Sequence, residues 1–186
     1  MNVGIIGSGG REHAICVSLK NSKNTNNIYC FPGNAGTSLL AKNIETDLNN
    51  FEGLKKLIQK FDIDLVIIGP EKPLVDGLVD YLKKNRIKVF GPNKIASQLE
   101  GSKIFTKKLC EKYDIPTASF GVFDDITKSL SYLKKCKFPI VVKADGLASG
   151  KGVYICETLE QSTKAVKEIF DGKFGKAKEI LIEEFL

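Results

Sequence analysis

The segment KADGLASGKGVYI, residues 143–155, combines lysines and glycines in a way that is typical of a phosphate-binding loop. Backbone N–H groups of such a loop donate to phosphate oxygens, and a lysine beside them adds a point charge. The spacing differs from that of a P-loop, which has four residues between its first glycine and Gly-Lys and then a hydroxyl side chain. Here three residues separate Gly146 from Gly150, and Gly152 stands where the hydroxyl is required. The loop therefore needs a different explanation.

The residues on both sides of this loop are typical of strands. Residues 153–156 are rich in β-branched and aromatic side chains, and an apolar run precedes Lys143. We therefore predict a hairpin whose glycine-rich loop closes over a triphosphate as a lid, with Lys143 as a cation near its base. Lys103, at the start of a predicted helix, supplies a second cation. The last predicted strand ends in residues 183–186, whose backbone groups are expected to bind an adenine edge.

A second glycine-rich turn, residues 7–12, follows a predicted strand and opens a predicted helix. In this context backbone N–H groups and the helix dipole bind phosphate. A Rossmann turn has a third small residue at the position of Glu12 and an acid at the end of the second strand, which here ends in Phe31-Pro32-Gly33. Both differences disfavour NAD, so an oxidoreductase ranks last. The guanidinium of Arg11 suits a pair of phosphate oxygens, and a purely structural turn remains the alternative.

Two more turns, residues 32–37 and 69–71, are predicted to lie beside the first. Together the three turns form a polar crevice that fits a sugar phosphate. Glu12 and His13 invite a catalytic interpretation, but a structural one is favoured. A glutamate in the first turn complements the helix dipole, and a lone histidine there is more often hydrogen-bonded as part of the structure.

The elements that position these residues alternate between strands and helices in the first half of the chain. We predict strands at 2–6, 28–31, 64–68 and 88–90 and helices at 12–19, 47–60 and 75–85. This alternation predicts a doubly wound parallel sheet of the α/β class, with its ligand edge at the carboxyl ends of the strands. The three turns fall on that edge.

The pattern changes after Gly91, which predicts a domain junction. Beyond it we predict helices at 102–113, 127–136 and 159–170, an extended segment at 115–117, and strands at 139–143, 153–156 and 179–183. The predicted domains are therefore 1–101 and 102–186, and the second contains a linker (102–121) and an α+β lid subdomain (122–186).

The composition, with 42% hydrophobic and 27% charged residues, is that of a soluble globular protein. The longest apolar run is far too short for a membrane span, and the first residues lack the pattern of a signal peptide, so we expect a cytoplasmic location and no membrane partner. Five scattered cysteines without a C-x-x-C pair suit reduced thiols better than a disulfide or zinc framework.

A net charge of +6 makes anionic partners plausible, nucleic acid among them. Only two of the 28 basic residues are arginines, and several lysines come as pairs on helical stretches: Lys55-Lys56, Lys83-Lys84, Lys107-Lys108 and Lys134-Lys135. Such pairs are typical of solvated helix faces, so we expect no nucleic-acid partner.

Eight segments, in order, resemble one enzyme family: GSGGREHA, PGNAGT, IGPEKPLVDGL, FGP, LEGSKIFTK, IPTASF, FPIVVKADGLASGKGV and IEEFL. The chain resembles ATP-grasp enzymes and, among them, the phosphoribosylamine–glycine ligase (glycinamide ribonucleotide synthetase) family, over essentially its whole length. The resemblance implies an N-terminal pre-ATP-grasp domain followed by the first, incomplete part of an ATP-grasp domain.

The resemblance also implies a reaction of de novo purine biosynthesis. ATP phosphorylates the carboxylate of glycine, and the amine of 5-phosphoribosylamine attacks the glycyl phosphate; Mg²⁺ is required. A mixed anhydride must be shielded from water, which agrees with a lid. By resemblance, the residues that hold ATP are Lys103, Lys143, Ser149, Gly150, Lys151, Gly152, Glu183, Glu184 and Leu186. Those that hold phosphoribosylamine are Gly9, Gly10, Arg11, Glu12, Asn34 and Glu71.

In this family the magnesium ligands, a ribose-contacting glutamate and an arginine that steadies the transferring phosphoryl group lie downstream of the segment that matches IEEFL. We therefore expect a truncated polypeptide with little or no ligase activity alone, and assign no metal ligand or catalytic residue. One alternative is another ATP-grasp ligase, of the carboxylase or D-alanine ligase type, which the GREHA and PGNAGT segments disfavour. The other is a non-catalytic nucleotide- or sugar-phosphate-binding module. The absence of the family's downstream catalytic residues from this sequence favours that alternative.

Overall fold

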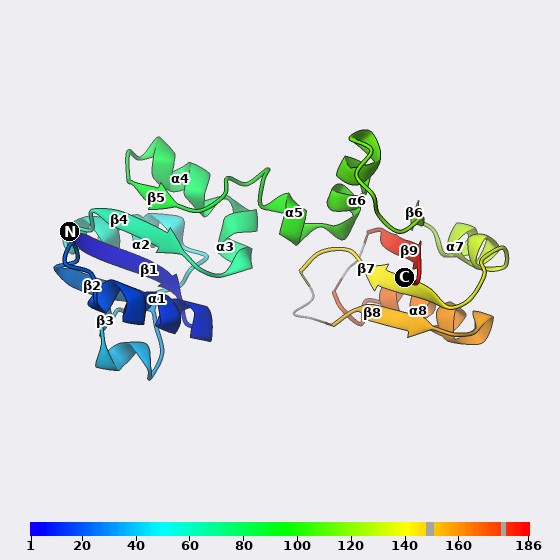
Figure 1. Cartoon of the computed structure of the whole chain (residues 1–186), viewed down its shortest axis with the longest axis horizontal. Coiled ribbons are helices and arrows are strands. Elements are labelled where there is room, and N and C mark those ends of the chain that lie inside the picture. Colours follow the sequence, from blue (N-terminus) through cyan, green and yellow to red (C-terminus); the bar gives the residue numbers. More distant parts are fainter. Residues whose placement is uncertain (148–150, 176–177) are drawn as a thin grey trace. The chain divides into compact units, whose positions relative to one another are not determined.

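The two halves of the chain contain sheets of different kinds (Figure 1). The computed structural model describes residues 1–147, 151–175 and 178–186. The chain divides into two units, Met1–Ser97 and Gln98–Leu186. A parallel sheet in the first unit and an antiparallel sheet in the second confirm the predicted α/β class with a separate α+β part.

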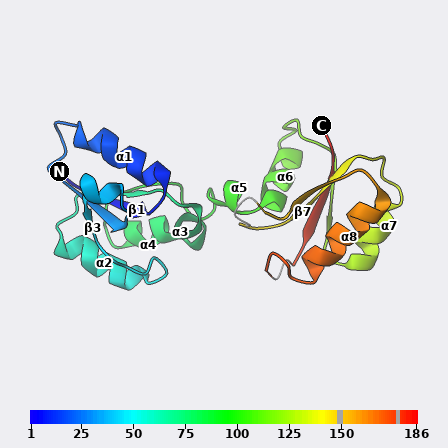
Figure 2. The same ribbon diagram turned by 90° about the horizontal axis from the view of Figure 1, so that it is seen from below.

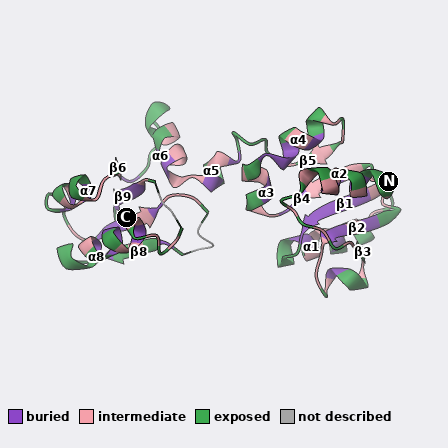
Figure 3. Cartoon of the chain, turned by 180° about the vertical axis from the view of Figure 1, so that it is seen from behind, coloured by how far each residue is buried: buried purple, intermediate pink, exposed green. Residues whose placement is uncertain are grey.

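The first unit is built on a five-stranded parallel sheet of order β3-β2-β1-β4-β5. The strands are β1 (Asn2–Gly7), β2 (Asn27–Pro32), β3 (Lys42–Asn43), β4 (Leu65–Ile68) and β5 (Val89–Phe90). Five consecutive residues of β1 are buried, as expected for a parallel strand that is covered on both faces. Buried residues accordingly concentrate on β1 and β2 in Figure 3.

Helices cover both faces of this sheet. They are α1 (Gly10–Lys20), the 3₁₀ turn η1 (Thr37–Leu39), α2 (Phe51–Lys60), α3 (Glu71–Asp76) and α4 (Leu78–Lys84). Figure 2 shows α1 on one side of β1 and α2 on the other. The core is divided in the same way, because Ile5 packs with residues of α1, whereas Ile6 packs with residues of α2 and α4.

Two predicted helices of the first unit differ from the observed ones. The helix predicted at 75–85 is replaced by α3 and α4, because Gly77 between them has a left-handed φ of 98° that ends the first helix. The helix predicted from residue 47 begins at Phe51, since the side chain of Asn50 accepts a hydrogen bond from Gly53 N and caps it there. The short strand β3 was not predicted.

The second unit contains a four-stranded antiparallel sheet of order β6-β9-β7-β8. The strands are β6 (Phe120–Phe123), β7 (Ile140–Ala144), β8 (Val153–Cys156) and β9 (Ile180–Glu184). The helices are α5 (Gln98–Gly101), α6 (Lys103–Lys112), α7 (Ile126–Leu133) and α8 (Leu159–Phe170). Helices α7 and α8 lie side by side (Figure 2), and both contact the sheet. None of the helices in the described parts of the chain has the length and apolarity that a membrane crossing requires.

Strand alternation separates two sets of side chains in this sheet. Ile140 and Val142 of β7 and Ile180 and Ile182 of β9 pack in the core formed with α7 and α8. The residues between them along each strand point to the opposite face. This geometry puts Lys143 and Glu183 on the face away from α7 and α8. The strand β6 was not predicted, because the extended segment was expected a few residues earlier.

Candidate functional site

Three turns meet at the carboxyl ends of β1, β2 and β4. Gly7 pairs with Pro32 in register, Gly33 N donates to Gly7 O at 3.1 Å, and Gly69 N donates to Ile6 O at 3.1 Å. The glycine-rich turns at residues 7–12, 32–37 and 69–71 are therefore adjacent in space. This is the arrangement that parallel strands impose on turns at one edge of a sheet.

The side chain of Glu12 fills the space between the first and third of these turns. It is 4% exposed, and its Oε2 accepts a hydrogen bond of 2.5 Å from Gly9 N. A Cβ at Gly7 would lie 2.7 Å from the Glu12 carboxyl carbon, and a Cβ at Gly69 would overlap with Oε1. Glycine at these positions therefore lets the carboxylate lie against the backbone. The buried side chain of Glu12 thus supports the conformation of the turns, which agrees with the favoured structural interpretation of this residue.

Arg11 joins the first turn to the third. Its Nη1 donates to Gly69 O, and its Nη2 lies 2.8 Å from Glu71 Oε1 in an ion pair on the surface. The hydrogen bond from Arg11 lowers the pKa of the Glu71 carboxyl below its ordinary value. Arg11 and Glu71, both predicted to bind substrate, are therefore brought together.

Asn34 joins the second turn to the first. Its Nδ2 donates to Ser8 O at 2.8 Å and Gly9 O at 3.3 Å. Asn43 was not singled out in the sequence, yet its Nδ2 donates to Asn34 O at 2.7 Å and holds this turn in place. Space is open around Gly10, where a Cβ would meet no atom within 4 Å. The first turn of α1 is thus framed by side chains and accessible at Gly10.

In the second unit, Asp145 attaches the glycine-rich loop to the start of α6. Its carboxylate accepts hydrogen bonds from Ser102 Oγ at 2.9 Å and from Ile104 N at 3.1 Å. Lys103 Nζ donates to Gly146 O at 2.9 Å. Asp145 was missed by sequence reasoning, since a cap that comes from more than 40 residues away has no local signal. The predicted cation Lys103 therefore lies at the loop.

Lys143 and Glu183, predicted to hold nucleotide, form an ion pair through Lys143 Nζ and Glu183 Oε1. On the other side of the carboxylate, Lys107 Nζ lies 2.8 Å from Oε2. This ammonium group is at ion-pair distance but off the hydrogen-bonding direction, so Oε2 accepts no hydrogen bond from the described residues. Burial alone would raise the pKa of the Glu183 carboxyl, but the two lysines outweigh burial and lower it.

The burial of Lys107 corrects one expectation from the sequence. The Lys107-Lys108 pair was expected on a solvated helix face, and this is wrong for Lys107, which is buried. Lys108 is exposed as expected. The reason is that α6 lies against β9, where the Glu183 carboxylate gives the ammonium group of Lys107 a partner.

The loop of the hairpin is only partly described. Ser149 and Gly150 lie outside the described residues, and Lys151 is exposed. Gly152 has a left-handed φ of 79° and its carbonyl accepts a hydrogen bond of 2.8 Å from Ala144 N, which closes the hairpin. The structure thus brings Lys103, Lys143 and the base of the loop into one region of the second unit.

At the carboxyl end of β9, backbone groups that were expected to be free are hydrogen-bonded to neighbouring strands. The backbone of Glu183 and Glu184 pairs with β7 on one side and with β6 and Ser119 on the other, where Glu184 N donates to Ser119 O at 3.0 Å. The Glu184 side chain also accepts a hydrogen bond from Ser119 N. Phe185 and Leu186 follow β9 and are exposed. Binding of an adenine edge by residues 183–186 stays a prediction.

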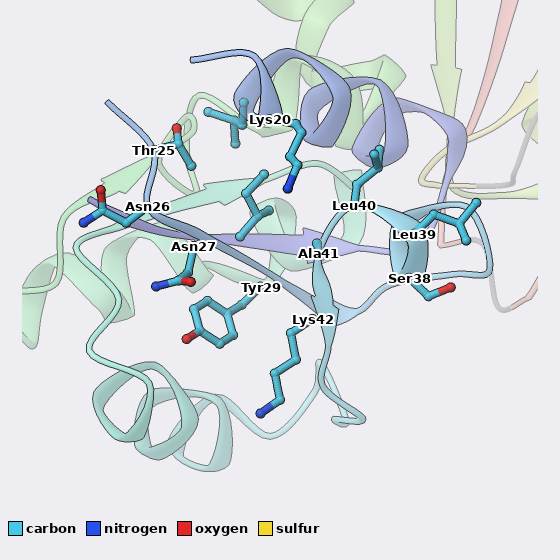
Figure 4. Close-up of a pocket in the computed structure, with 12 residues that line it drawn as sticks. Lys20, Thr25, Asn26, Asn27, Tyr29, Ser38, Leu39, Leu40, Ala41 and Lys42 are labelled. Atoms are coloured by element: carbon cyan, nitrogen blue, oxygen red, sulfur yellow. The ribbon is translucent and has the colours of Figure 1, made fainter. Parts of the chain in front are cut away.

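A separate groove of about 420 Å³ lies between the end of α1, the start of β2 and the segment from η1 to β3 (Figure 4). Polar and basic side chains line it, among them Lys20, Asn27 and Lys42. It contains none of the predicted site residues, because it lies at the amino-terminal end of β2. Nowhere in the three described stretches do His, Cys, Asp or Glu side chains gather in a group able to hold a metal ion.

Comparison with known proteins assigns the chain to a family. Residues 1–100 match the N domain of phosphoribosylglycinamide synthetase, and residues 101–186 match its ATP-grasp (A) domain. The phosphoribosylamine–glycine ligase of Clostridium acetobutylicum is 48% identical over all of this chain and 45% of its own length. The resemblance predicted from the sequence is thereby confirmed.

Solved structures give the same picture. The phosphoribosylamine–glycine ligase of Thermotoga maritima matches with a TM-score of 0.81 and 34% identity over 100% of this chain and 44% of its own. An ADP complex of an N5-carboxyaminoimidazole ribonucleotide synthetase matches with a TM-score of 0.77 and 17% identity over 100% and 47%, which shows a shared fold. The chain spans less than half the length of these relatives. It belongs to the phosphoribosylglycinamide synthetase family.

Proposed function

We propose that the chain is part of an ATP-dependent ligase that joins glycine to 5-phosphoribosylamine and so makes glycinamide ribonucleotide for purine biosynthesis. One observation carries this proposal: all of the chain is 48% identical to a phosphoribosylamine–glycine ligase. The activity is that of the longer enzyme, of which this chain supplies two matched regions.

The second unit supplies the ATP site in this proposal. The ammonium groups of Lys103 and Lys143 lie near the glycine-rich loop, and both are paired with oxygen atoms of the protein, Gly146 O and the Glu183 carboxylate. When ATP binds, its phosphate oxygens replace these protein oxygens as partners of the two ammonium groups, and N–H groups of the loop donate further hydrogen bonds to the phosphates. Ser149, Gly150, Lys151 and Gly152 belong to this loop. Phe185 and Leu186, with the end of β9, hold the adenine.

The first unit supplies the phosphoribosylamine site. N–H groups in the first turn of a helix have no partner within the helix, so the start of α1 at Gly10 and Arg11 can bind the phosphate group. Asn34 and Glu71 border this position. Glu12 is buried beneath the turn, so its part is to fix the conformation of Gly9.

The reaction activates a carboxylate. Glycine is a poor acyl donor until its carboxylate accepts the terminal phosphoryl group of ATP and ADP leaves. The amine of phosphoribosylamine then displaces phosphate, loses a proton and forms the amide. A closed loop keeps water from the mixed anhydride. The Mg²⁺ that the resemblance implies has no group of ligands among residues 1–147, 151–175 and 178–186, so no step is assigned to it in this chain.

A reducing compartment and small-molecule partners complete the proposal. All five cysteines are free thiols, which suits the cytoplasm. The partners are ATP, glycine and 5-phosphoribosylamine, without a nucleic acid or a membrane.

A chimera tests the proposed function. This chain replaces the matched part of the Clostridium acetobutylicum relative, and ADP formation is measured with each substrate omitted in turn. We expect ADP to form only when glycine and phosphoribosylamine are both present. ADP formation with D-alanine or bicarbonate in place of glycine would identify another ATP-grasp ligase, and a folded chimera without any turnover would contradict the proposal.

A further inference from the structure

A buried carboxylate is shared by two lysines from different elements of the second unit. Glu183 of β9 is 7% exposed and lies between Lys107 of α6 and Lys143 of β7. No second carboxylate pairs with either lysine in the described part of the chain. The three side chains therefore carry a formal net charge of +1, which favours the approach of an anion.

The two lysines are held very differently. The side chain of Lys107 is 11% exposed, and its Nζ donates to Thr117 Oγ1 at 2.7 Å and to Ala118 O at 3.1 Å in addition to its ion pair with Glu183. Two of the three N–H donors of the ammonium group are therefore used in hydrogen bonds, and the ion pair adds a third contact. The ring of Phe120 lies 5.5 Å away and further restricts this side chain. Lys107 is fixed in place.

Lys143 has fewer partners and more access to solvent. Its side chain is 24% exposed, and Glu183 is its only ion-pair or hydrogen-bond partner among the described residues. Two of its three N–H donors therefore remain for other acceptors. Lys143 can exchange partners, whereas Lys107 cannot do so without breaking three contacts.

The difference matters because a buried carboxylate without a partner is unfavourable. If Glu183 had Lys143 alone, the departure of Lys143 toward a ligand would leave the carboxylate uncompensated. With Lys107 in place, the carboxylate keeps a cation 2.8 Å away. Lys107 thus lowers the free-energy cost of moving Lys143 away from Glu183, because the buried carboxylate is not left without a cation.

We propose that Lys107 is a positioning residue for the nucleotide site: it holds Glu183, so that Lys143 is free to leave this carboxylate for a phosphate oxygen of ATP. The inference rests on the proposed function, because it takes ATP as the ligand. It adds a role for a lysine that does not itself touch the nucleotide.

The test is a calorimetric titration of ATP into the 186-residue chain and its variants. Lys107→Met should raise the Kd for ATP about tenfold, because Lys143 then stays bound to Glu183. Adding Glu183→Gln to Lys107→Met should bring the Kd back to within about threefold of the parent, since no carboxylate then holds Lys143. The neighbouring exposed Lys108→Met is the matched control and should not change the Kd.

If Lys107 only stabilised the fold, adding Glu183→Gln would not restore ATP binding. The double variant would then bind ATP no better than Lys107→Met. That result, or an unchanged Kd for a folded Lys107→Met, would overturn the inference and leave the proposed function standing. Absence of ATP binding by the parent chain would overturn the inference, whereas the proposed function is tested separately by the chimera.

A second measurement needs no substitution, in case Lys107→Met does not fold. Competitive acetylation of the parent chain, followed by mass spectrometry, should show that ATP protects Lys143 and that Lys107 is unreactive with and without ATP. A rise in the reactivity of Lys107 on ATP binding would contradict the inference.

Discussion

Replacing Glu183 with glutamine is expected to lower the free energy of unfolding by about 3 kcal/mol. The substitution removes the carboxylate that Lys107 and Lys143 share and leaves two ammonium groups near each other without a counter-charge. The expected loss lies at the lower end of the range for breaking a buried ion pair, because Lys143 is partly exposed. Urea denaturation of parent and variant measures the difference.

The next residue provides the control. Glu184 is exposed, and its Oε1 accepts a hydrogen bond from Ser119 N that a glutamine oxygen can also accept. Glu184→Gln should therefore change the free energy of unfolding by no more than about 0.5 kcal/mol. Equal losses of unfolding free energy in Glu183→Gln and Glu184→Gln would show that the buried ion pairs of Glu183 do not stabilise the fold.

Replacing Gly69 with alanine is expected to cost about 2 kcal/mol of unfolding free energy, the range for overpacking a filled site. The new Cβ would overlap with the Glu12 carboxylate, which is buried and confined against Gly7 and Gly9. Relief requires Glu12 to give up its hydrogen bond with Gly9 N, which also displaces the turn proposed to bind phosphoribosylamine. Thermal and urea unfolding measure the loss.

Two further variants make this result specific. Gly10→Ala should leave stability unchanged or raise it by up to about 0.5 kcal/mol, since nothing lies within 4 Å of the new Cβ and the residue is helical. In a double-mutant cycle, Gly69→Ala should cost much less when Glu12→Ala has already removed the carboxylate. Additive losses would contradict the proposed contact.

The sequence predicted elements best where a local pattern defines both ends. The periodicity of residues 159–170 and the Thr158 cap agree with α8, whose bounds were predicted correctly. The parallel sheet followed from apolar runs that end in glycine turns. By contrast, β3 has two residues and gives no pattern, and the break at Gly77 was hidden because apolar residues continue at helical spacing on both sides.

For the candidate site, the sequence predicted residue types but not their partners. Lys143 stands out beside its glycines, yet its pairing with Glu183 depends on the register of β7 and β9. Lys107 resembled a surface lysine because its burial arises only when α6 packs against the sheet. Asp145 likewise acts on an element distant in sequence. Tertiary contacts of this kind have no local signature.

The central claim is that Lys143 and the neighbouring glycine-rich loop bind the phosphates of ATP, and a calorimetric comparison of parent, Lys143→Met and Lys128→Met tests it most directly. Lys128 is an exposed lysine of α7 and serves as the control for the loss of one surface charge. We expect Lys143→Met to weaken ATP binding by at least about tenfold and Lys128→Met to leave it unchanged. Equal affinities for parent and folded Lys143→Met would contradict the claim.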